Sequence, residues 1–247
     1  MKEMKGGYPL KRYHKVIAWG VGVVLLFGLF QFPLQYVIPN YKAIPQPLAG
    51  QTIVLDPGHG GADGGAKGKN DVHEKEITLK VAKLLKEKLE QAGALVYLTR
   101  EEDVDLADKE TKGLSRRKSE DIRKRLKFIH DKDADFFLSI HLNAILDERW
   151  SGAQTFYYDG LDENKHLATM IQSELIRNLE NTDRTPLPLN TVYLLKYAEV
   201  PGSLVEVGFL SNEKERKLLE NSSYQRKLAT SIYQGMIRYV MEDRDAT

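Results

Sequence analysis

The chain has 247 residues, of which 42% are hydrophobic and 29% are charged, a composition typical of a globular protein. It contains no cysteine, which excludes disulfides, thiolate nucleophiles, zinc fingers and iron–sulfur clusters, so any metal must be held by histidines and carboxylates. The formal net charge is +1, but residues 1–15 are strongly basic and the rest of the chain is slightly acidic. Nucleic-acid-binding domains are usually basic, so the composition argues against nucleic acid as a partner.

The amino terminus has the pattern of a membrane segment. Residues 16–32 contain no charged side chain, and a helix of that length would rise by about 26 Å, close to the thickness of the bilayer hydrocarbon. We expect a basic cytoplasmic tail over residues 1–15, a membrane anchor or signal segment over residues 16–38, and a proline-containing linker over residues 39–50. A convincing signal-peptide cleavage site is absent, which favours an uncleaved anchor over a cleaved signal or a buried core helix. An anchor or a signal places the remaining chain outside the cytoplasm.

Residues 51–242 have the pattern of one catalytic domain, because short runs of β-branched and aromatic residues alternate there with helical patterns. The predicted strands cover residues 52–55, 94–99, 136–140, 153–158, 191–195 and 203–207. Helical spacing of apolar residues predicts helices over residues 77–89, 122–129, 167–179 and 228–240. This alternation predicts an α/β fold with a largely parallel sheet, in which functional residues lie beyond the carboxyl ends of the strands.

A glycine-rich segment, residues 57–68, follows the first predicted strand, and we call it the glycine loop. It matches neither common phosphate-binding pattern, because Asp63 stands where each pattern needs a small residue. The loop places His59 on a tight turn, and its glycines allow an imidazole to approach a metal without crowding. The alternative is a flexible turn that carries a solvated histidine.

Three further residues stand at positions where chemistry is expected. His141 ends an apolar strand, Glu206 lies within the apolar run 204–209, and Glu74 lies in the first turn of a helix expected over residues 74–91. An unpaired carboxylate in an apolar environment is costly, so Glu206 should be paired, protonated or exposed to a polar cleft. Each residue also has a structural explanation: a core histidine, a buried salt bridge, and a carboxylate that favours the helix dipole.

Together these residues match the composition of a catalytic zinc site, which has three protein ligands, an open position and a carboxylate that handles protons. The HExxH motif does not supply the site, because Ile77 stands where its second histidine is required. His73 is a candidate to orient a neighbouring ligand. We expect the other histidines, His14, His130 and His166, to be solvated.

The segments IVLDPGHGGADGGAKG, HEKEITL, VYLTR, DADFFLSIHLNA, SGAQTFYY and LVEVGFLSN occur in this order. Over residues 51–242 the chain therefore resembles the zinc-dependent N-acetylmuramoyl-L-alanine amidases, the type 3 cell-wall amidases. SIHLNA followed by SGAQTFYY, with a single apolar segment at the amino terminus, is most similar to the CwlD type, the spore-cortex amidases. Residues 101–120, which we call the charged segment, depart from the shorter family members, and we interpret them as a solvated surface loop.

The resemblance implies a mixed, mainly parallel six-stranded sheet flanked by helices. It makes His59, Glu74 and His141 the ligands of Zn2+ and Glu206 the catalytic glutamate, and Asn143 is a candidate donor to the developing oxyanion. The implied substrate is peptidoglycan, cut at the amide between the lactyl group of muramic acid and L-alanine.

For the CwlD type, the resemblance also implies a location between the forespore and mother-cell membranes and cooperation with a separate muramic-acid deacetylase in forming the muramic δ-lactam. A regulatory lipoprotein or another exported partner is a further expectation. Two alternatives stay open: a zinc peptidase that cuts within the stem peptide, and a membrane-tethered wall-binding protein without activity.

Overall fold

The computed structural model describes residues 10–31, 46–145 and 147–246, and it contains two separate units. The first includes helix α1 (Leu10–Gln31), and the second begins at Gln46. Among the described residues, no helix meets the length and apolarity needed to cross a membrane. The predicted membrane segment, residues 16–38, continues beyond α1 into residues 32–38, which lie outside the described residues, as do residues 1–9 and 39–45 of the predicted tail and linker. The anchor therefore stays a prediction.

The second unit is built on a six-stranded sheet with the strand order β2-β1-β3-β6-β4-β5. Strands β2, β1, β3 and β6 are parallel, β4 runs antiparallel to β6, and β5 runs parallel to β4. The predicted mixed, mainly parallel sheet is therefore confirmed. The strand bounds are β1 (Thr52–Pro57), β2 (Leu95–Leu98), β3 (Phe136–Asn143), β4 (Gln154–Tyr157), β5 (Leu187–Pro188) and β6 (Gly202–Phe209).

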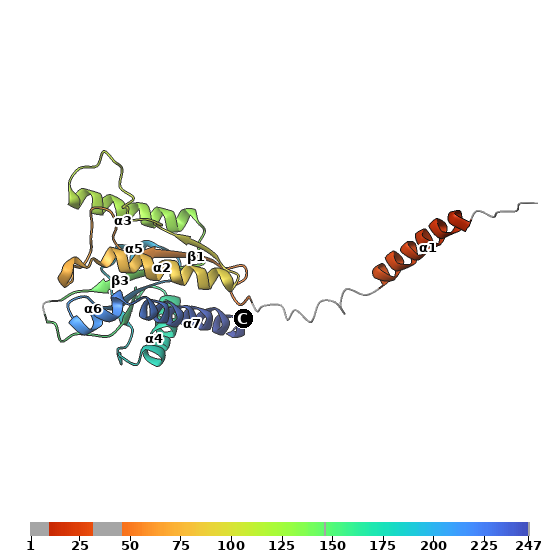
Figure 1. Cartoon of the computed structure of the whole chain (residues 1–247). Coiled ribbons are helices and arrows are strands. Elements are labelled where there is room, and N and C mark those ends of the chain that lie inside the picture. The colour runs from red at the N-terminus through yellow and green to blue at the C-terminus, as the bar shows by residue number, and fades with distance from the viewer. Residues whose placement is uncertain (1–9, 32–45, 146, 247) are drawn as a thin grey trace, which may run out of the picture. The chain divides into compact units, whose positions relative to one another are not determined.

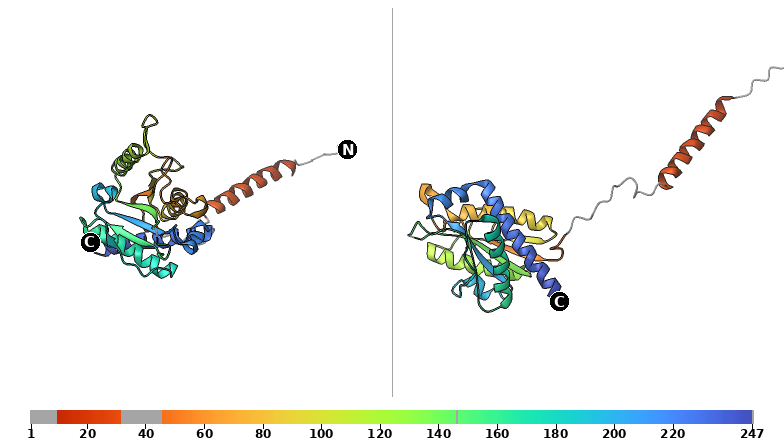
Figure 2. Two further views of the ribbon diagram at one scale, coloured as in Figure 1. Left: turned by 90° about the vertical axis from the view of Figure 1, so that its left-hand side faces the viewer. Right: turned by 90° about the horizontal axis from the view of Figure 1, so that it is seen from below.

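Helices cover both faces of this sheet (Figures 1 and 2). One face packs against α2 (Glu74–Gln91), α4 (Asp162–Leu179) and α7 (Ser222–Ala246), and the other against α3 (Leu114–Asp131) and α5 (Tyr193–Tyr197). The short elements η2 (Lys69–Asp71) and α6 (Glu213–Glu220) complete the unit. Successive strand residues alternate between the two cores, as Val54 does with its neighbours Ile53 and Leu55, so the nearly continuous apolar strands are buried on both sides.

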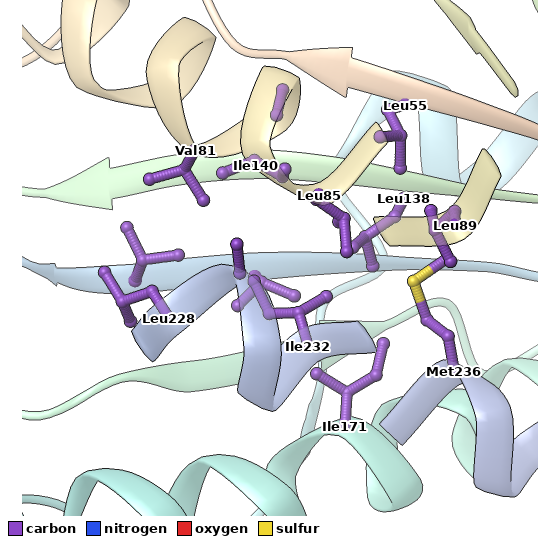
Figure 3. Close-up of a cluster of buried hydrophobic side chains, with 14 of the residues drawn as sticks. Leu55, Val81, Leu85, Leu89, Leu138, Ile140, Ile171, Leu228, Ile232 and Met236 are labelled. Atoms are coloured by element: carbon purple, nitrogen blue, oxygen red, sulfur yellow. The ribbon is translucent and has the colours of Figure 1, made fainter. Parts of the chain in front are cut away.

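The larger core lies between the sheet and the helices α2, α4 and α7 (Figure 3). Helical spacing brings one face of α2 and one face of α7 onto the same strands. Each fully buried leucine, isoleucine or methionine contributes about 1.5–3 kcal/mol relative to an exposed position. The core side chains labelled in Figure 3 are Leu55, Val81, Leu85, Leu89, Leu138, Ile140, Ile171, Leu228, Ile232 and Met236.

One predicted strand is wrong. Residues 191–195 do not form a strand, because Tyr193–Tyr197 is the short helix α5, and the fifth strand is Leu187–Pro188 instead. The rings of Tyr193 and Tyr197 lie one helical turn apart with centroids at 4.8 Å, while Leu194 and Leu195 turn into the smaller core. Proline is disfavoured inside a sheet but is tolerated at its edge, where β5 lies.

The central strand β3 should carry much of the folding free energy. Leu138 is fully buried there, so Leu138→Ala removes packed methyl groups and leaves a cavity, which should lower the free energy of unfolding by about 2–5 kcal/mol. Leu95→Ala is the matched control in β2, where the side chain is 54% exposed, and it should change stability far less. Urea unfolding of the purified proteins measures both. Equal losses in the two variants would contradict this account of the core.

Candidate functional site

The candidate site lies where the carboxyl ends of β1, β3 and β6 meet, because these three strands are neighbours in the sheet. His59 comes two residues after β1, and His141 and Glu206 are direct partners in the register of β3 and β6. Glu74 is the first residue of α2, whose amino terminus reaches the same edge. The topology thus brings together four residues that lie far apart along the chain.

His59, Glu74 and His141 form a compact group, which we call the His–Glu–His group. Each offers one ligand atom, and the three atoms lie within 4.8 Å of one another. His59 Nε2 lies 3.2 Å from Glu74 Oε2, and His141 Nδ1 lies 2.9 Å from Glu74 Oε1. The two imidazole rings meet edge to face, with centroids 5.0 Å apart. Both imidazoles therefore present a ring nitrogen to the same buried carboxylate.

Backbone donors also hold the Glu74 carboxylate in place. The amide of Leu142 donates to Oε1 at 2.9 Å, and the amide of Ala66, in the glycine loop, donates to Oε2 at 2.7 Å. Glu74 is nearly inaccessible to solvent, so this side chain is tied to β3 and to the loop at once. A carboxylate whose position is set by backbone groups is suited to metal ligation, because little reorganisation is needed.

Two glycines make room for the group. A Cβ at Gly58 would lie 2.3 Å from His141 Cε1, and a Cβ at Gly65 would lie 2.5 Å from Glu74 Oε2 and 2.6 Å from His59 Cδ2. Gly65 also has a φ of +68°, which favours glycine. The glycine loop therefore lets the backbone come close to the imidazoles, as its sequence predicted.

The charges of the group support metal binding. Burial acts to raise the pKa of Glu74, but hydrogen bonds from His141 and His59 outweigh it, so the pKa lies well below its usual value and the side chain is ionised. Burial acts to lower the pKa of His59, yet the neighbouring Glu74 and Asp63 carboxylates raise it overall. Two nitrogen donors and one ionised oxygen donor at the end of buried strands are a donor set that fits zinc.

Glu206 differs from Glu74 although the two carboxylates are close. Its Oε2 is buried and has no hydrogen-bond partner in the part of the chain that the structure describes. Burial, together with the charge of Glu74, raises the pKa of Glu206 to about 7, against the opposing effect of His141. A carboxyl group with a pKa near neutrality can both accept and release a proton at physiological pH.

The sequence analysis named four other polar residues in the described domain, Asn143, His73, His130 and His166. Asn143 ends β3 after a shift in register, and its carbonyl accepts from Leu210 at 2.8 Å, so its part in stabilising an oxyanion stays a prediction. Within the described part of the chain, His73 Nδ1 is buried without a hydrogen-bond partner, and the ring lies close to Gly64. His130 Nε2 lies 2.9 Å from the carbonyl of Ala198, and the ring of His166 packs on Tyr239.

A buried charged network beneath the glycine loop was not found from the sequence. Asp56 is fully buried at the end of β1, and its Oδ1 lies 2.8 Å from Arg125 Nη1. Thr99 and Ser139 donate to the same carboxylate at 2.6 and 2.7 Å. The available signal was the spacing of α3, where Asp121 and Arg125 share the helix face of the buried Ile129. Spacing shows the shared face but not the pairing of Arg125 with a strand.

Two buried arginines hold the carbonyls of the glycine loop. Arg125 donates to the carbonyls of Pro57 at 2.8 Å and His59 at 2.7 Å. Arg100, which follows β2, donates to the carbonyls of Pro57 and Gly58, each at 3.0 Å. Guanidinium groups suit this task because their donors form a rigid planar fork. The two arginines therefore hold the backbone from Pro57 to His59 in place.

The charged segment, residues 101–120, is largely exposed at the surface as expected, but it is not just solvated. Asp103 accepts from the amide of Gly61 at 2.9 Å and from Lys75 at 2.7 Å. Lys118 pairs with Asp63 of the glycine loop at 2.9 Å. The segment also continues into α3, which begins at Leu114. Its charges are therefore used in contacts with the loop that carries His59.

Comparisons with known proteins identify the family of the chain. The model of the N-acetylmuramoyl-L-alanine amidase family matches residues 53–238. A germination-specific N-acetylmuramoyl-L-alanine amidase of Bacillus subtilis (strain 168) is 47% identical over 236 residues, which are 96% of this chain and 99% of the relative. The chain therefore belongs to the N-acetylmuramoyl-L-alanine amidase family, which confirms the family predicted from the motifs.

Solved structures give the same result. The CwlD amidase of Clostridioides difficile, solved in complex with the GerS lipoprotein, is 42% identical with a TM-score of 0.77, and the match covers 78% of this chain and all of that one. An N-acetylmuramoyl-L-alanine amidase of Clostridium difficile 630 is 31% identical with a TM-score of 0.69, covering 77% of this chain and 97% of that one. The predicted similarity to the CwlD type is confirmed.

The Asp56–Arg125 pair should stabilise the fold in a pH-dependent way. Burial acts to raise the pKa of Asp56, but Arg125 and the two hydroxyl donors lower it to about 2. Because this value lies below the unfolded value of about 3.9, the stabilisation is fully present above about pH 4 and is lost as the pH falls through about 2.

Asp56→Asn should therefore lower the free energy of unfolding at pH 7 by about 3–5 kcal/mol, because Arg125 keeps its charge without its partner on β1. The difference from the unmodified protein should shrink as the pH approaches 2, where Asp56 itself becomes protonated. Urea unfolding at several pH values measures it. Asp131→Asn, which removes an exposed partner of Lys127 on α3, is the control and should have little effect. A difference that stays constant from pH 7 to pH 2 would contradict this ion pair.

Proposed function

We propose that the protein is a zinc-dependent N-acetylmuramoyl-L-alanine amidase whose metal ligands are His59, Glu74 and His141 and whose catalytic residue is Glu206. The observation that carries the proposal is the position of the His–Glu–His group beside a buried carboxyl oxygen of Glu206, which has no hydrogen-bond partner among the described residues. Three ligands and a separate proton-handling carboxylate are the usual composition of a hydrolytic zinc site. Membership of the amidase family indicates which bond is cut, the amide between the lactyl group of muramic acid and L-alanine.

Zinc held by this group would supply Lewis-acid chemistry, which polarises a carbonyl and makes water ionise at a pH of about 7. The chain has no cysteine, and its two imidazoles and one carboxylate are the donor types that remain for such an ion. Hydrogen bonds from Leu142 and Ala66 to Glu74 hold one ligand before any metal arrives. Arg125 donates to the carbonyls of Pro57 and His59, and these contacts hold the backbone that carries the ligand His59.

Glu206 acts first as a base and then as an acid. Its carboxylate takes a proton from the attacking water as the new carbon–oxygen bond forms at the lactyl carbonyl. The same proton then passes to the nitrogen of L-alanine as the amide bond breaks. The products are a lactyl carboxylate on the muramic acid and a stem peptide with a free amino terminus. Burial raises the pKa of Glu206, which makes this carboxylate a stronger base than an exposed glutamate.

We assign the activity to the spore cortex, on peptidoglycan outside the cytoplasm. The support is the similarity to a germination-specific amidase over nearly the full length of both chains. In this assignment the stem peptide is removed so that a separate deacetylase can form the muramic δ-lactam. An exported lipoprotein partner is part of the proposal, because the similar CwlD amidase was solved in complex with the GerS lipoprotein. The predicted membrane segment, residues 16–38, would keep the enzyme at the membrane surface.

The cleaved bond can be identified directly. The purified protein, supplied with zinc and with intact spore-cortex peptidoglycan, should release stem peptides that begin with L-alanine and leave free lactyl carboxylates on the glycan. Mass spectrometry of the digest measures both products. Stem peptides shortened at an internal amide would instead identify a zinc peptidase, and an unchanged digest in the presence of bound zinc would favour a wall-binding protein without activity.

The roles of the site residues can be separated by two substitutions. Glu206→Gln should keep zinc bound with normal stoichiometry but lower kcat by about 100-fold or more, because the variant cannot accept the proton. His141→Ala should lose most of the zinc, because it removes a ligand. Glu213→Gln, on the exposed surface of α6, is the control and should change neither property. Metal analysis together with the release rate of stem peptides distinguishes them, and normal turnover by Glu206→Gln would refute the catalytic assignment.

A further inference from the structure

We infer that Asp63 is a positioning residue that sets the tautomer of His59, and that Lys118 acts through Asp63. The inference rests on the proposed function, because it concerns one of the proposed zinc ligands. Asp63 Oδ2 lies 2.8 Å from His59 Nδ1, on the side of the ring opposite to Nε2, which faces Glu74. The contacts thus form a chain from α3 through the glycine loop to the His–Glu–His group.

A tight turn holds Asp63 beside the imidazole. The amides and carbonyls of Gly60 and Asp63 exchange hydrogen bonds of 2.9 and 3.0 Å, which closes the loop immediately after His59. His59 itself has a φ of 61°, in the left-handed region that residues other than glycine rarely adopt. The surrounding contacts must therefore hold His59 in this conformation. Its bond to Asp63 also fixes how the ring is turned.

The carboxylate of Asp63 selects one form of the imidazole. An ionised carboxylate only accepts hydrogen bonds, so the ring must place its proton on Nδ1, next to Asp63. With Nδ1 engaged by Asp63, Nε2, which faces Glu74, is the ring nitrogen left to ligate a metal. A carboxylate that receives the second N–H of a ligating histidine fixes its orientation and raises its basicity. In the opposite tautomer the proton on Nε2 would block ligation.

The second oxygen of Asp63 has other partners. Oδ1 accepts from the amide of Gly65 at 3.2 Å and lies 2.9 Å from Lys118 Nζ on α3. These two donors orient the carboxyl group so that Oδ2 faces the imidazole. Lys118 is half exposed, so it contributes orientation and charge rather than burial. The charged segment therefore reaches the proposed metal site through one hydrogen-bonded chain.

The same donors make Asp63→Asn a sharp test. Because Gly65 and Lys118 point at Oδ1, the side-chain oxygen of the asparagine should take that place and its NH2 group should face His59 Nδ1. The imidazole must then accept at Nδ1 and carry its proton on Nε2, which opposes metal binding. We expect zinc affinity to fall by about 100-fold in Asp63→Asn and by about tenfold in Asp63→Ala, in which water can serve Nδ1.

The experiment measures the zinc dissociation constant of the full-length protein by competition with a chromophoric chelator, with circular dichroism to check folding. Asp71→Asn, in η2 just after the glycine loop, is the control, because Asp71 pairs with Lys67 and His73 instead, and this variant should bind zinc like the unmodified protein. Lys118→Met should weaken zinc binding less than tenfold in the unmodified background and have no further effect in Asp63→Asn, since it acts through Asp63.

The relative zinc affinities of Asp63→Asn and Asp63→Ala decide whether Asp63 sets the tautomer of His59. A purely structural side chain would be replaced better by the isosteric asparagine than by alanine, so weaker zinc binding in alanine than in asparagine would overturn the inference. Zinc binding unchanged in both variants would overturn it as well, while the proposed function would stand. If the unmodified protein binds no zinc, the proposed function fails first, and the two failures are therefore distinguishable.

Discussion

The buried ion pair between Asp56 and Arg125 is the interaction on which the site depends. Asp56 is the penultimate residue of β1 and Arg125 belongs to α3, so the pair joins the sheet to the helix that packs on one of its faces. The same guanidinium group donates to the carbonyls of Pro57 and His59, where the chain leaves the sheet. Charge pairs that are buried this deeply add little net stability over an apolar core, but they specify one arrangement. Here the ion pair specifies the conformation of the glycine loop, which places His59 beside Glu74 and Asp63.

Above this pair, two carboxylates close together have opposite properties because their surroundings differ. Glu74 receives hydrogen bonds from two backbone amides and two imidazoles, which favour its charged form. Glu206 has a buried oxygen without a hydrogen-bond partner in residues 46–145 and 147–246, and it lies near the charge of Glu74, so its neutral form is favoured. Pairs of acidic groups whose pKa values are pushed apart mark acid–base sites. The same chemical group thus serves as a ligand in one place and as a proton carrier in the other.

The sequence was sufficient to predict the fold class and the four residues that meet at the sheet edge. Alternating strand and helix patterns imply a parallel sheet, and residues that follow parallel strands converge whatever their separation along the chain. Asp56, Arg125 and Asp63 were not predicted, because their roles depend on which side chains meet across segments 60 or more residues apart, or on a local turn. Charged residues on a helix are usually solvated, so Arg125 and Lys118 carried no signal of their contacts.

The charged segment shows how such contacts give a surface region a functional position. It leads from Arg100, which holds the carbonyls of Pro57 and Gly58, to the start of α3, which carries Arg125. Between them Asp103 binds the amide of Gly61, and the glycines that follow His59 leave space for this approach, since a Cβ at Gly60 would lie 2.2 Å from the carbonyl oxygen of Val104. The backbones of the charged segment and the glycine loop therefore lie close together. The charged segment therefore helps to hold the loop that carries His59.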